Sequence, residues 1–183
     1  MDYRGRSAFK LLEINIRHKI INNGDRVYDL GCCPGGWLQV ASELTGSTAS
    51  DPLVCGIDLL HTEPLSGTKI MQGNVFNQED LSSLLILGNL KKGDSLISDM
   101  APNTTGNRDV DFMSISELNM ATLGSANKLL KKGGNLLMKT FHGKDEHQYF
   151  VTFIFIGHAI YLLNLEIIQN DFQPIVQNKA ASK

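Results

Sequence analysis

Two charged residues stand at the ends of otherwise apolar runs, and together they could carry acid–base chemistry. Asp99 closes the run SLISD, shortly before Pro102, and Lys139 interrupts the run NLLMKTF. A carboxylate at the end of an apolar strand is costly unless it is paired or faces a cleft. A lysine amine facing the same cleft could serve as a base. A turn-capping aspartate and a lysine that extends to the surface are the alternatives, and the two residues alone leave both open.

A basic cluster near the start of the chain could add to this chemistry or bind an anion. Arg4, Arg6 and Lys10 lie in YRGRSAFKLLE, and Arg6 and Lys10 share a face if the segment is helical. A cation close to Lys139 would favour the neutral amine that a base needs. The cluster could equally be the solvated start of a helix. Because the formal net charge is -2, a polyanion would have to bind a local patch of this kind.

A glycine-rich turn follows the apolar run VYDL and indicates a ligand site. The turn GCCPGGW runs from Gly31 to Trp37 and lacks the lysine of a P-loop and the second glycine of a dinucleotide loop. Glycines let a ligand approach the backbone closely, and the absence of a basic residue favours a ligand without phosphates. Asp58 could accept hydrogen bonds from ribose hydroxyls. A nucleoside joined to an amino acid, such as S-adenosylmethionine, fits these features, although any strand-to-helix turn favours glycine.

The elements that must position these residues alternate between strand and helix. Such alternation, with mostly apolar strands, predicts a parallel sheet covered by helices on both faces. In the first helix, Phe9, Leu12, Ile16 and Ile20 recur at helical spacing. We expect strands over 26–30, 54–60, 69–75, 95–99 and 135–140, and helices over 7–21, 37–44, 78–87 and 114–130. Ligands of such sheets bind beyond the carboxyl ends of the strands, where Gly31, Asp58, Asn74, Asp99 and Lys139 fall.

Composition sets outer bounds on the class of protein. A chain of 183 residues with 42% hydrophobic residues suits one globular domain over 1–183. The three cysteines form no C-x-x-C motif, and the five histidines show no ligand spacing. We therefore expect neither a disulfide scaffold nor a metal site.

Six segments taken in order resemble the FtsJ/RrmJ methyltransferases over residues 1–145: DYRGRSAFKLLE, DLGCCPGGWLQVA, GIDLLH, QGNV, SDMAPN and GNLLMKTF. The resemblance implies a doubly wound, Rossmann-like α/β fold that transfers a methyl group from S-adenosylmethionine to an RNA ribose 2′-hydroxyl. It assigns Lys10, Asp99 and Lys139 to a Lys-Asp-Lys-Glu tetrad, in which Lys139 accepts the proton. It implies cofactor contacts at Gly31, Pro34, Gly35, Gly36, Trp37, Asp58, Asn74 and Asp99. Asn74 departs from the pattern, since many members have aspartate there.

The same resemblance indicates the partner and location. Arg4, Arg6, Lys10 and Arg17 would contact RNA phosphates. DLLHTEPLSGT and SDMAPNTTGNRDVD are most similar to the mitochondrial branch, which modifies a uridine of large-subunit ribosomal RNA. We therefore expect a monomeric mitochondrial enzyme acting within a ribosomal particle, with the cytoplasm or nucleus as alternatives. A transfer-RNA or messenger-cap ribose enzyme, a catalytically weak RNA-binding relative, and a small-molecule or protein methyltransferase are the rival functions.

Residues 146–183 depart from the family pattern. The segment 149–168 is almost wholly apolar, yet His158 and Asn164 interrupt it, so we expect a buried helix and a strand rather than a membrane span. In the family the tetrad glutamate follows a stretch like K-x-x-A-S-R, which the terminal QNKAASK resembles. The glutamates after Lys139 are Glu146 and Glu166, and neither follows that stretch. We expect the fourth tetrad residue and the last strand to be absent, with Glu166 as the alternative fourth residue.

Overall fold

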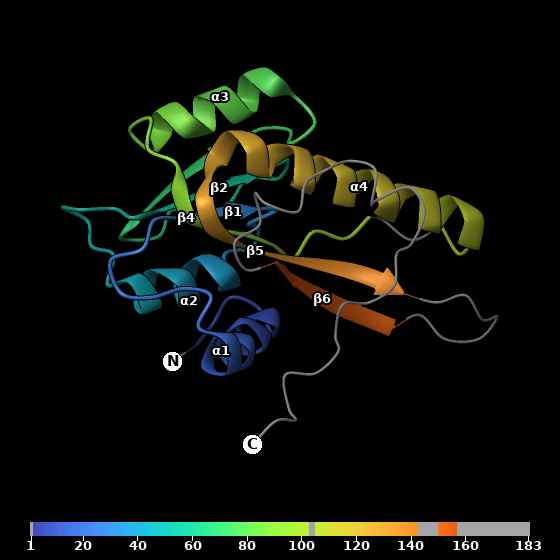
Figure 1. The fold of residues 1–183 in the computed structure, drawn as a ribbon, viewed down its shortest axis with the longest axis horizontal. Coiled ribbons are helices and arrows are strands. Elements are labelled where there is room, and N and C mark those ends of the chain that lie inside the picture. Colours follow the sequence, from blue (N-terminus) through green and yellow to red (C-terminus); the bar gives the residue numbers. More distant parts are fainter. Residues whose placement is uncertain (1, 103–104, 143–149, 157–183) are drawn as a thin grey trace.

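The computed structural model describes residues 2–102, 105–142 and 150–156. Figure 1 shows a single sheet with α1 and α2 against one face and α3 and α4 against the other, which confirms the predicted doubly wound α/β fold. The elements in chain order are α1 (Ser7–His18), β1 (Val27–Leu30), α2 (Gly36–Thr45), β2 (Val54–Asp58), β3 (Thr68–Gln72), α3 (Gln78–Leu87), β4 (Gly93–Ser98), α4 (Arg108–Leu129), β5 (Leu130–His142) and β6 (Phe150–Ile156).

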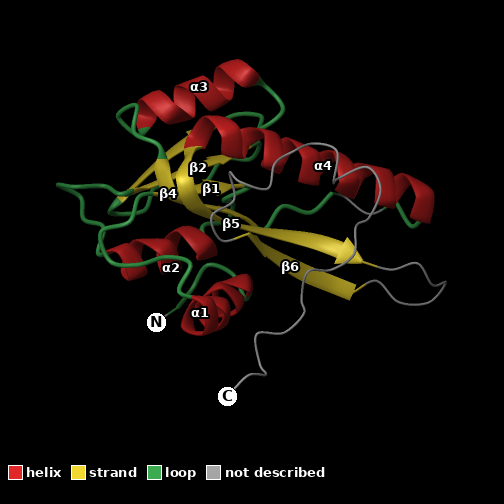
Figure 2. Ribbon diagram, viewed as in Figure 1, coloured by secondary structure: helices red, strands yellow, loops and turns green. Residues whose placement is uncertain are grey.

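The sheet has a topological switch point at its centre. Its strand order is β3-β2-β1-β4-β5-β6, so the chain builds outward from β1 in one direction and then from β4 in the other. The first five strands pair in parallel, and β6 pairs antiparallel with β5 (Figure 2). In open α/β sheets, ligands bind outside the carboxyl ends of the strands at such a switch point. The site is therefore expected beyond β1 and β4.

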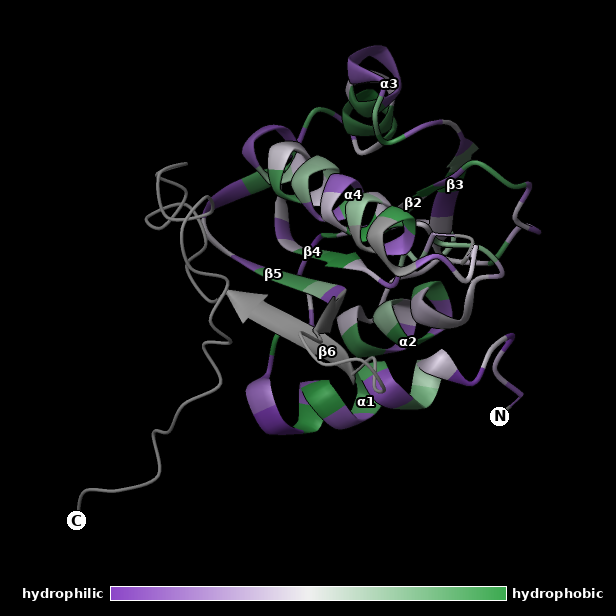
Figure 3. Cartoon of the chain, turned by 90° about the vertical axis from the view of Figure 1, so that its right-hand side faces the viewer, coloured by the Kyte–Doolittle hydropathy of each residue, from purple (hydrophilic) through white to green (hydrophobic). Residues whose placement is uncertain are grey.

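The strands are apolar because helices cover both of their faces. All four residues of β1 are buried. Tyr28 packs into the cluster that β1 shares with α3 and α4, and Val27 packs into the cluster on the side of α1 and α2. Figure 3 shows the hydrophobic residues of β4 and β5 between α4 and the layer formed by α1 and α2. Asp29 is the charged exception in this central strand.

The apolar stripe that indicated α1 is buried only in part, since Ile20 is fully buried and Leu12 packs against the core. Phe9 and Ile16 are 60% and 78% exposed, whereas Ala8, Leu11 and Asn15 are buried. The helix ends at His18 because Lys19 adopts a left-handed conformation with a φ of 48°. Spacing identifies a helix but cannot decide between two apolar stripes on it, since that choice depends on what packs against the helix.

The tail prediction of a helix is wrong for Phe150–Ile156, which forms β6 against β5. This segment is rich in aromatic and β-branched residues, which favour strands, and it pairs with a β5 edge that would otherwise be open. Glu146, Glu166 and residues 157–183 lie outside the described residues, so the missing strand and missing glutamate stay predictions. Within the part of the chain that the structure describes, no helix is both long and apolar enough to cross a membrane.

Candidate functional site

The turn after β1 requires glycine at two positions. Gly31 and Gly35 have φ values of +77° and +113°, in the left-handed region that disfavours other residues. A Cβ atom at Gly31 would also collide with the side chain of Met100. Both glycines are therefore required by the backbone itself, whether or not a ligand lies beside them.

The start of α2 presents backbone N–H groups that could bind an anionic group. The helix begins at Gly36, and its N-cap residue Gly35 provides no side-chain hydrogen bond. The first N–H groups of a helix lack partners within the helix and attract anions. The side chain of Trp37 is buried and donates from Nε1 to the carbonyl of Ser7 at 2.9 Å. A ligand contact at Trp37, as predicted, would therefore come from its backbone.

Asp58 ends β2 and ties that end to the glycine turn. Its carboxylate accepts hydrogen bonds from the backbone N–H of Cys33 and of Leu60, both at 2.8 Å. An ionised carboxylate has about four acceptor positions, so capacity remains for ribose hydroxyls. Since Asp58 is only partly buried, the predicted ribose contact is sterically and chemically reasonable.

Asn74 lies after β3, at the same edge of the sheet. Its Oδ1 accepts from the N–H of Phe76 at 3.0 Å, which orients the amide. Its Nδ2 makes no hydrogen bond to any residue within the described ranges, so this donor is available for a ring nitrogen of a base. The predicted contact therefore remains chemically possible with asparagine in place of aspartate.

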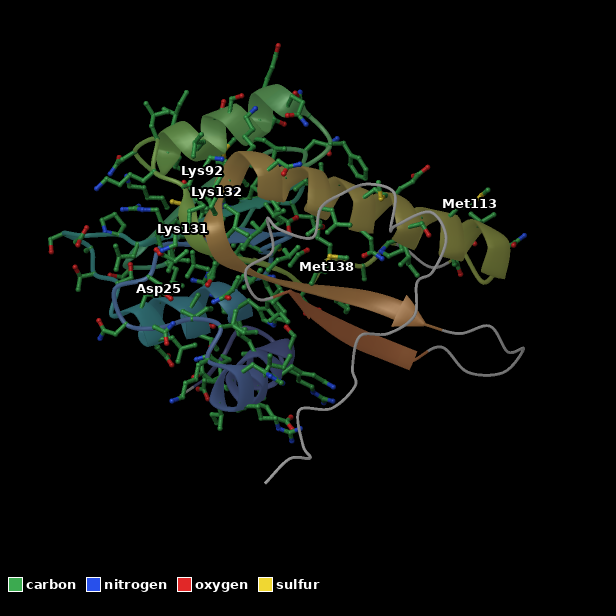
Figure 4. The ribbon with its side chains drawn as sticks, in the orientation of Figure 1. Asp25, Lys92, Met113, Lys131, Lys132 and Met138 are labelled. Carbon is green, nitrogen blue, oxygen red and sulfur yellow. The ribbon has the colours of Figure 1, made fainter. Side chains whose placement is uncertain are left out.

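Asp99 and Lys139 meet as the sequence predicted. The Lys139 Nζ lies 2.8 Å from Asp99 Oδ1 and donates to the Asp99 carbonyl at 2.6 Å. Ser98 pairs with Met138 in the β4–β5 register, so the next residue of each strand lies at the same level of the sheet. Met138 packs on the α4 side (Figure 4), and side chains alternate along a strand. Lys139 therefore faces the side that α1 covers.

The sequence interpretation missed Asp29 as a site residue. Asp29 is fully buried in β1, and neither carboxylate oxygen accepts a hydrogen bond from a described residue. Burial raises the pKa of this carboxyl well above its usual value, and the negative charges of Asp99 and Asp58 raise it further. The signal was the acid in VYDLG, since a carboxylate inside a central parallel strand needs a compensating cation.

The carboxylates of Asp58 and Asp99 make this end of the sheet negative, Lys139 pairs with only one of them, and both interact electrostatically with the buried Asp29 carboxyl. A ligand with a positive centre close to the strand ends and an anionic group at the start of α2 would match this arrangement. An adenosine joined to a sulfonium-bearing amino acid has these charges. Among the residues that the structure describes, no three potential metal ligands cluster.

The four basic residues predicted to contact RNA differ in their exposure and in their hydrogen-bond partners. Lys10 and Arg6 are exposed, and Lys10 forms no hydrogen bond or ion pair with a described residue. The structure therefore joins Asp99 to Lys139 but does not join Lys10 to them. Arg17 is paired with Glu13 at 2.6 Å on the surface of α1. Arg4 does not present a free guanidinium, because it donates to the backbone carbonyls of Glu63 and Pro64.

The fold and the site together define a Rossmann-like methyltransferase: a doubly wound sheet, a glycine turn after β1, an acid after β2, and an Asp–Lys pair after β4 and on β5. Residues 3–156 match the family model for FtsJ-like methyltransferases. The chain belongs to this family. The methyl donor that the family and fold imply is S-adenosylmethionine, and the charges of the site fit it.

Similar proteins agree with this assignment. The chain is 44% identical over 150 residues to the ribosomal RNA large subunit methyltransferase E of Bartonella bacilliformis, covering 82% of this chain and 62% of that protein. It is 42% identical over 147 residues to the protein of the same name from Brucella ovis, covering 80% of this chain and 60% of that protein. The chain thus spans less than two thirds of the length of these curated relatives.

Two solved structures show the fold. A protein from Plasmodium falciparum, assigned as a ribosomal RNA methyltransferase, matches with a TM-score of 0.68 and 25% identity, over 78% of this chain and 80% of that one. Fibrillarin from Aeropyrum pernix, which was crystallised with natively bound S-adenosylmethionine, matches with a TM-score of 0.52 and 19% identity, over 76% of this chain and 55% of that one.

Proposed function

We propose that this chain transfers a methyl group from S-adenosylmethionine to a ribose 2′-hydroxyl of ribosomal RNA, at a uridine of the large subunit. The observation that carries the proposal is the Asp99–Lys139 pair, held at 2.8 Å beside the glycine turn of an FtsJ-like fold. The printed names of the curated relatives support large-subunit ribosomal RNA as the substrate.

The cofactor residues have separable tasks in this proposal. Asp58 accepts from the ribose hydroxyls, Asn74 Nδ2 donates to the base, and the first N–H groups of α2 bind the carboxylate of the amino-acid part. Asp99 supplies negative potential that favours a cationic sulfonium, and that cation would in turn favour ionisation of the buried Asp29 carboxyl. When bound, S-adenosylmethionine supplies an electrophilic methyl group on sulfur.

The enzyme must act mainly on the ribose hydroxyl, because that hydroxyl is a weak nucleophile. The Lys139 amine, in its neutral form, would accept the proton of the attacking hydroxyl, while bound S-adenosylmethionine would supply the methyl group and leave as the neutral thioether. Asp99 holds that amine at the strand ends through its carboxylate and its backbone carbonyl. Holding the hydroxyl in line with the C–S bond would supply the rest of the rate enhancement. Arg6 and Lys10, which are exposed, face the RNA in this scheme, and any effect of Lys10 on Lys139 would act without a direct contact between them.

A catalytically weak RNA-binding relative is the second candidate. Such a relative would keep the fold and the basic residues at the start of α1 but would not transfer the methyl group. The mitochondrial location, the monomeric state and the ribosomal particle as the setting belong to the same proposal. Cell fractionation with a tagged full-length protein tests the location.

The test is methyl transfer from radiolabelled cofactor to ribosomal, transfer and capped RNA side by side. We expect label in ribosomal RNA, in dinucleotides that resist alkali because the 2′-oxygen is methylated. Lys139→Met should lower the incorporation rate of the label by about 10²–10⁴-fold, whereas Lys132→Met, at the exposed start of the same strand (Figure 4), should retain it. Label in bases or in protein would contradict the proposal, and cofactor binding without any label would favour the non-catalytic relative.

A further inference from the structure

Arg4 bridges two segments that lie far apart in the sequence. Its Nη1 donates to the carbonyl of Glu63 at 2.6 Å and, more weakly, to that of Pro34 at 3.5 Å. Its Nη2 donates to the carbonyl of Pro64 at 2.9 Å. Pro34 belongs to the glycine turn, and Glu63 and Pro64 belong to the segment that follows Asp58. The guanidinium therefore connects the backbone of both segments.

The position of the Arg4 side chain is itself fixed from α2. The backbone N–H of Arg4 donates to Gln39 Oε1 at 2.8 Å. The side chain packs on Gly35, where a Cβ atom would lie 3.0 Å from Nη1 and 3.2 Å from Cδ of Arg4. A planar guanidinium can donate from two nitrogens to separate carbonyls, whereas a lysine presents one compact ammonium. The contact is therefore specific for arginine rather than for positive charge.

Other contacts also hold the glycine turn to this part of the chain, since the backbone N–H groups of Gly31 and Cys32 donate to the Ile57 carbonyl at 2.9 and 3.2 Å. Asp58 accepts from the Cys33 N–H at 2.8 Å. The remaining side-chain links are long sulfur contacts, from Cys33 Sγ to the His61 carbonyl at 3.7 Å and between Cys32 Sγ and Thr62 Oγ1 at 3.8 Å. Hydrogen bonds from charged donors are stronger than such contacts. Arg4 therefore adds a charged donor, which packs on Gly35 and donates to Glu63 and Pro64, to a link that Asp58 also holds.

We propose that Arg4 is a positioning residue for the cofactor, which sets the spacing of the two walls of its site, and is not a phosphate contact for RNA. The inference rests on the proposed function, because these walls are the glycine turn and the segment after Asp58. Since both terminal nitrogens of Arg4 already donate to backbone carbonyls, Arg6 is the arginine of this segment that faces the RNA.

The experiment separates cofactor binding from RNA binding in Arg4→Ala, with Arg6→Ala as the matched loss of charge. Calorimetry with S-adenosylhomocysteine should show at least tenfold weaker binding for Arg4→Ala and a change below twofold for Arg6→Ala. RNA binding measured over a salt series should show the reverse, with a shallower slope for Arg6→Ala only. Arg4→Lys keeps the charge but not the planar fork, so it should weaken cofactor binding and leave the salt slope unchanged.

Three results would overturn the inference. The first is an unchanged affinity of Arg4→Ala for S-adenosylhomocysteine. The second is a salt slope that flattens in Arg4→Ala as much as in Arg6→Ala. If Arg4→Ala does not fold, Arg4→Lys serves as the test instead. Normal affinity of Arg4→Lys for S-adenosylhomocysteine is the third result that would overturn the inference. A wild-type chain that binds no S-adenosylhomocysteine would instead refute the proposed function, and this inference with it.

Discussion

Replacing Asp29 by asparagine should stabilise the ligand-free chain and weaken its affinity for S-adenosylmethionine. The buried carboxyl makes no hydrogen bond to a described residue, and burial raises its pKa well above the usual value. The folded chain therefore holds a proton at pH values where the unfolded chain has released it. Folding takes up that proton, so stability falls as pH rises above the unfolded pKa of about 3.9 and continues to fall up to the folded pKa.

The size of this effect can be bounded. Each pH unit within the window costs about 1.4 kcal/mol, so the loss at pH 7 is at most about 4 kcal/mol. Asparagine cannot ionise and escapes this loss, but its buried amide still costs about 1–3 kcal/mol if it remains unpaired. We expect Asp29→Asn to change stability little at pH 5 and to raise the free energy of unfolding by about 1–3 kcal/mol at pH 7.5.

Urea unfolding without cofactor at the two pH values measures the difference. Asp51→Asn, at an exposed position, is the control and should change stability little at either pH. Calorimetry should show a larger loss of affinity for S-adenosylmethionine than for S-adenosylhomocysteine, because only the sulfonium charge favours ionisation of Asp29, which asparagine cannot undergo. Destabilisation by the same amount at both pH values would refute the reasoning, since it would mean that the carboxylate has a stabilising partner.

Three further predictions concern other parts of the site. Asp58→Ala should weaken binding of S-adenosylhomocysteine by more than tenfold in calorimetry, because it removes the ribose acceptor and two bonds that hold the turn; unchanged affinity would remove Asp58 from the site. Lys139→Met should lower the rate of methyl transfer by about 10²–10⁴-fold while S-adenosylhomocysteine still binds, and equal loss in the control Lys132→Met would contradict a specific role. Glu166→Ala should leave methyl transfer unchanged if the fourth tetrad residue is absent, and loss of activity would identify Glu166 as that residue.

The residue pattern was sufficient to predict the fold and the Asp99–Lys139 pair. Apolar strands alternating with helices allow few arrangements other than a parallel sheet covered on both faces. In such a sheet, residues at the ends of neighbouring strands must meet, so the pairing of β4 with β5 brings Asp99 to Lys139. The topology of the sheet alone therefore predicts that these two residues lie close together, without any knowledge of side-chain packing.

The hydrophobic pattern of the sequence could not predict which strands pair at the edge of the sheet or which face of a helix is buried. The strand β6 formed where a helix was expected, because strand pairing along β5 depends on a neighbour that local sequence does not show. Which stripe of α1 is buried likewise depends on the surface of α2 against which the helix packs, and so Phe9 lies exposed.

Local sequence determined that the strands and helices exist, in which order they come and where the backbone needs glycine, since these follow from short-range sterics and hydrophobic periodicity, whereas several strand ends differ from the expected ones by up to three residues. Only the tertiary structure decided the roles of Arg4 and Asp29. Arg4 looked like one member of a basic cluster until its guanidinium was found on carbonyls about sixty residues away. Asp29 looked like the end of an apolar run until the fold closed around it and left its carboxylate unpaired. The hydrogen-bond partners and the burial of a charged side chain come from segments distant in the sequence. They decide its protonation state and whether it binds a ligand or holds the fold together.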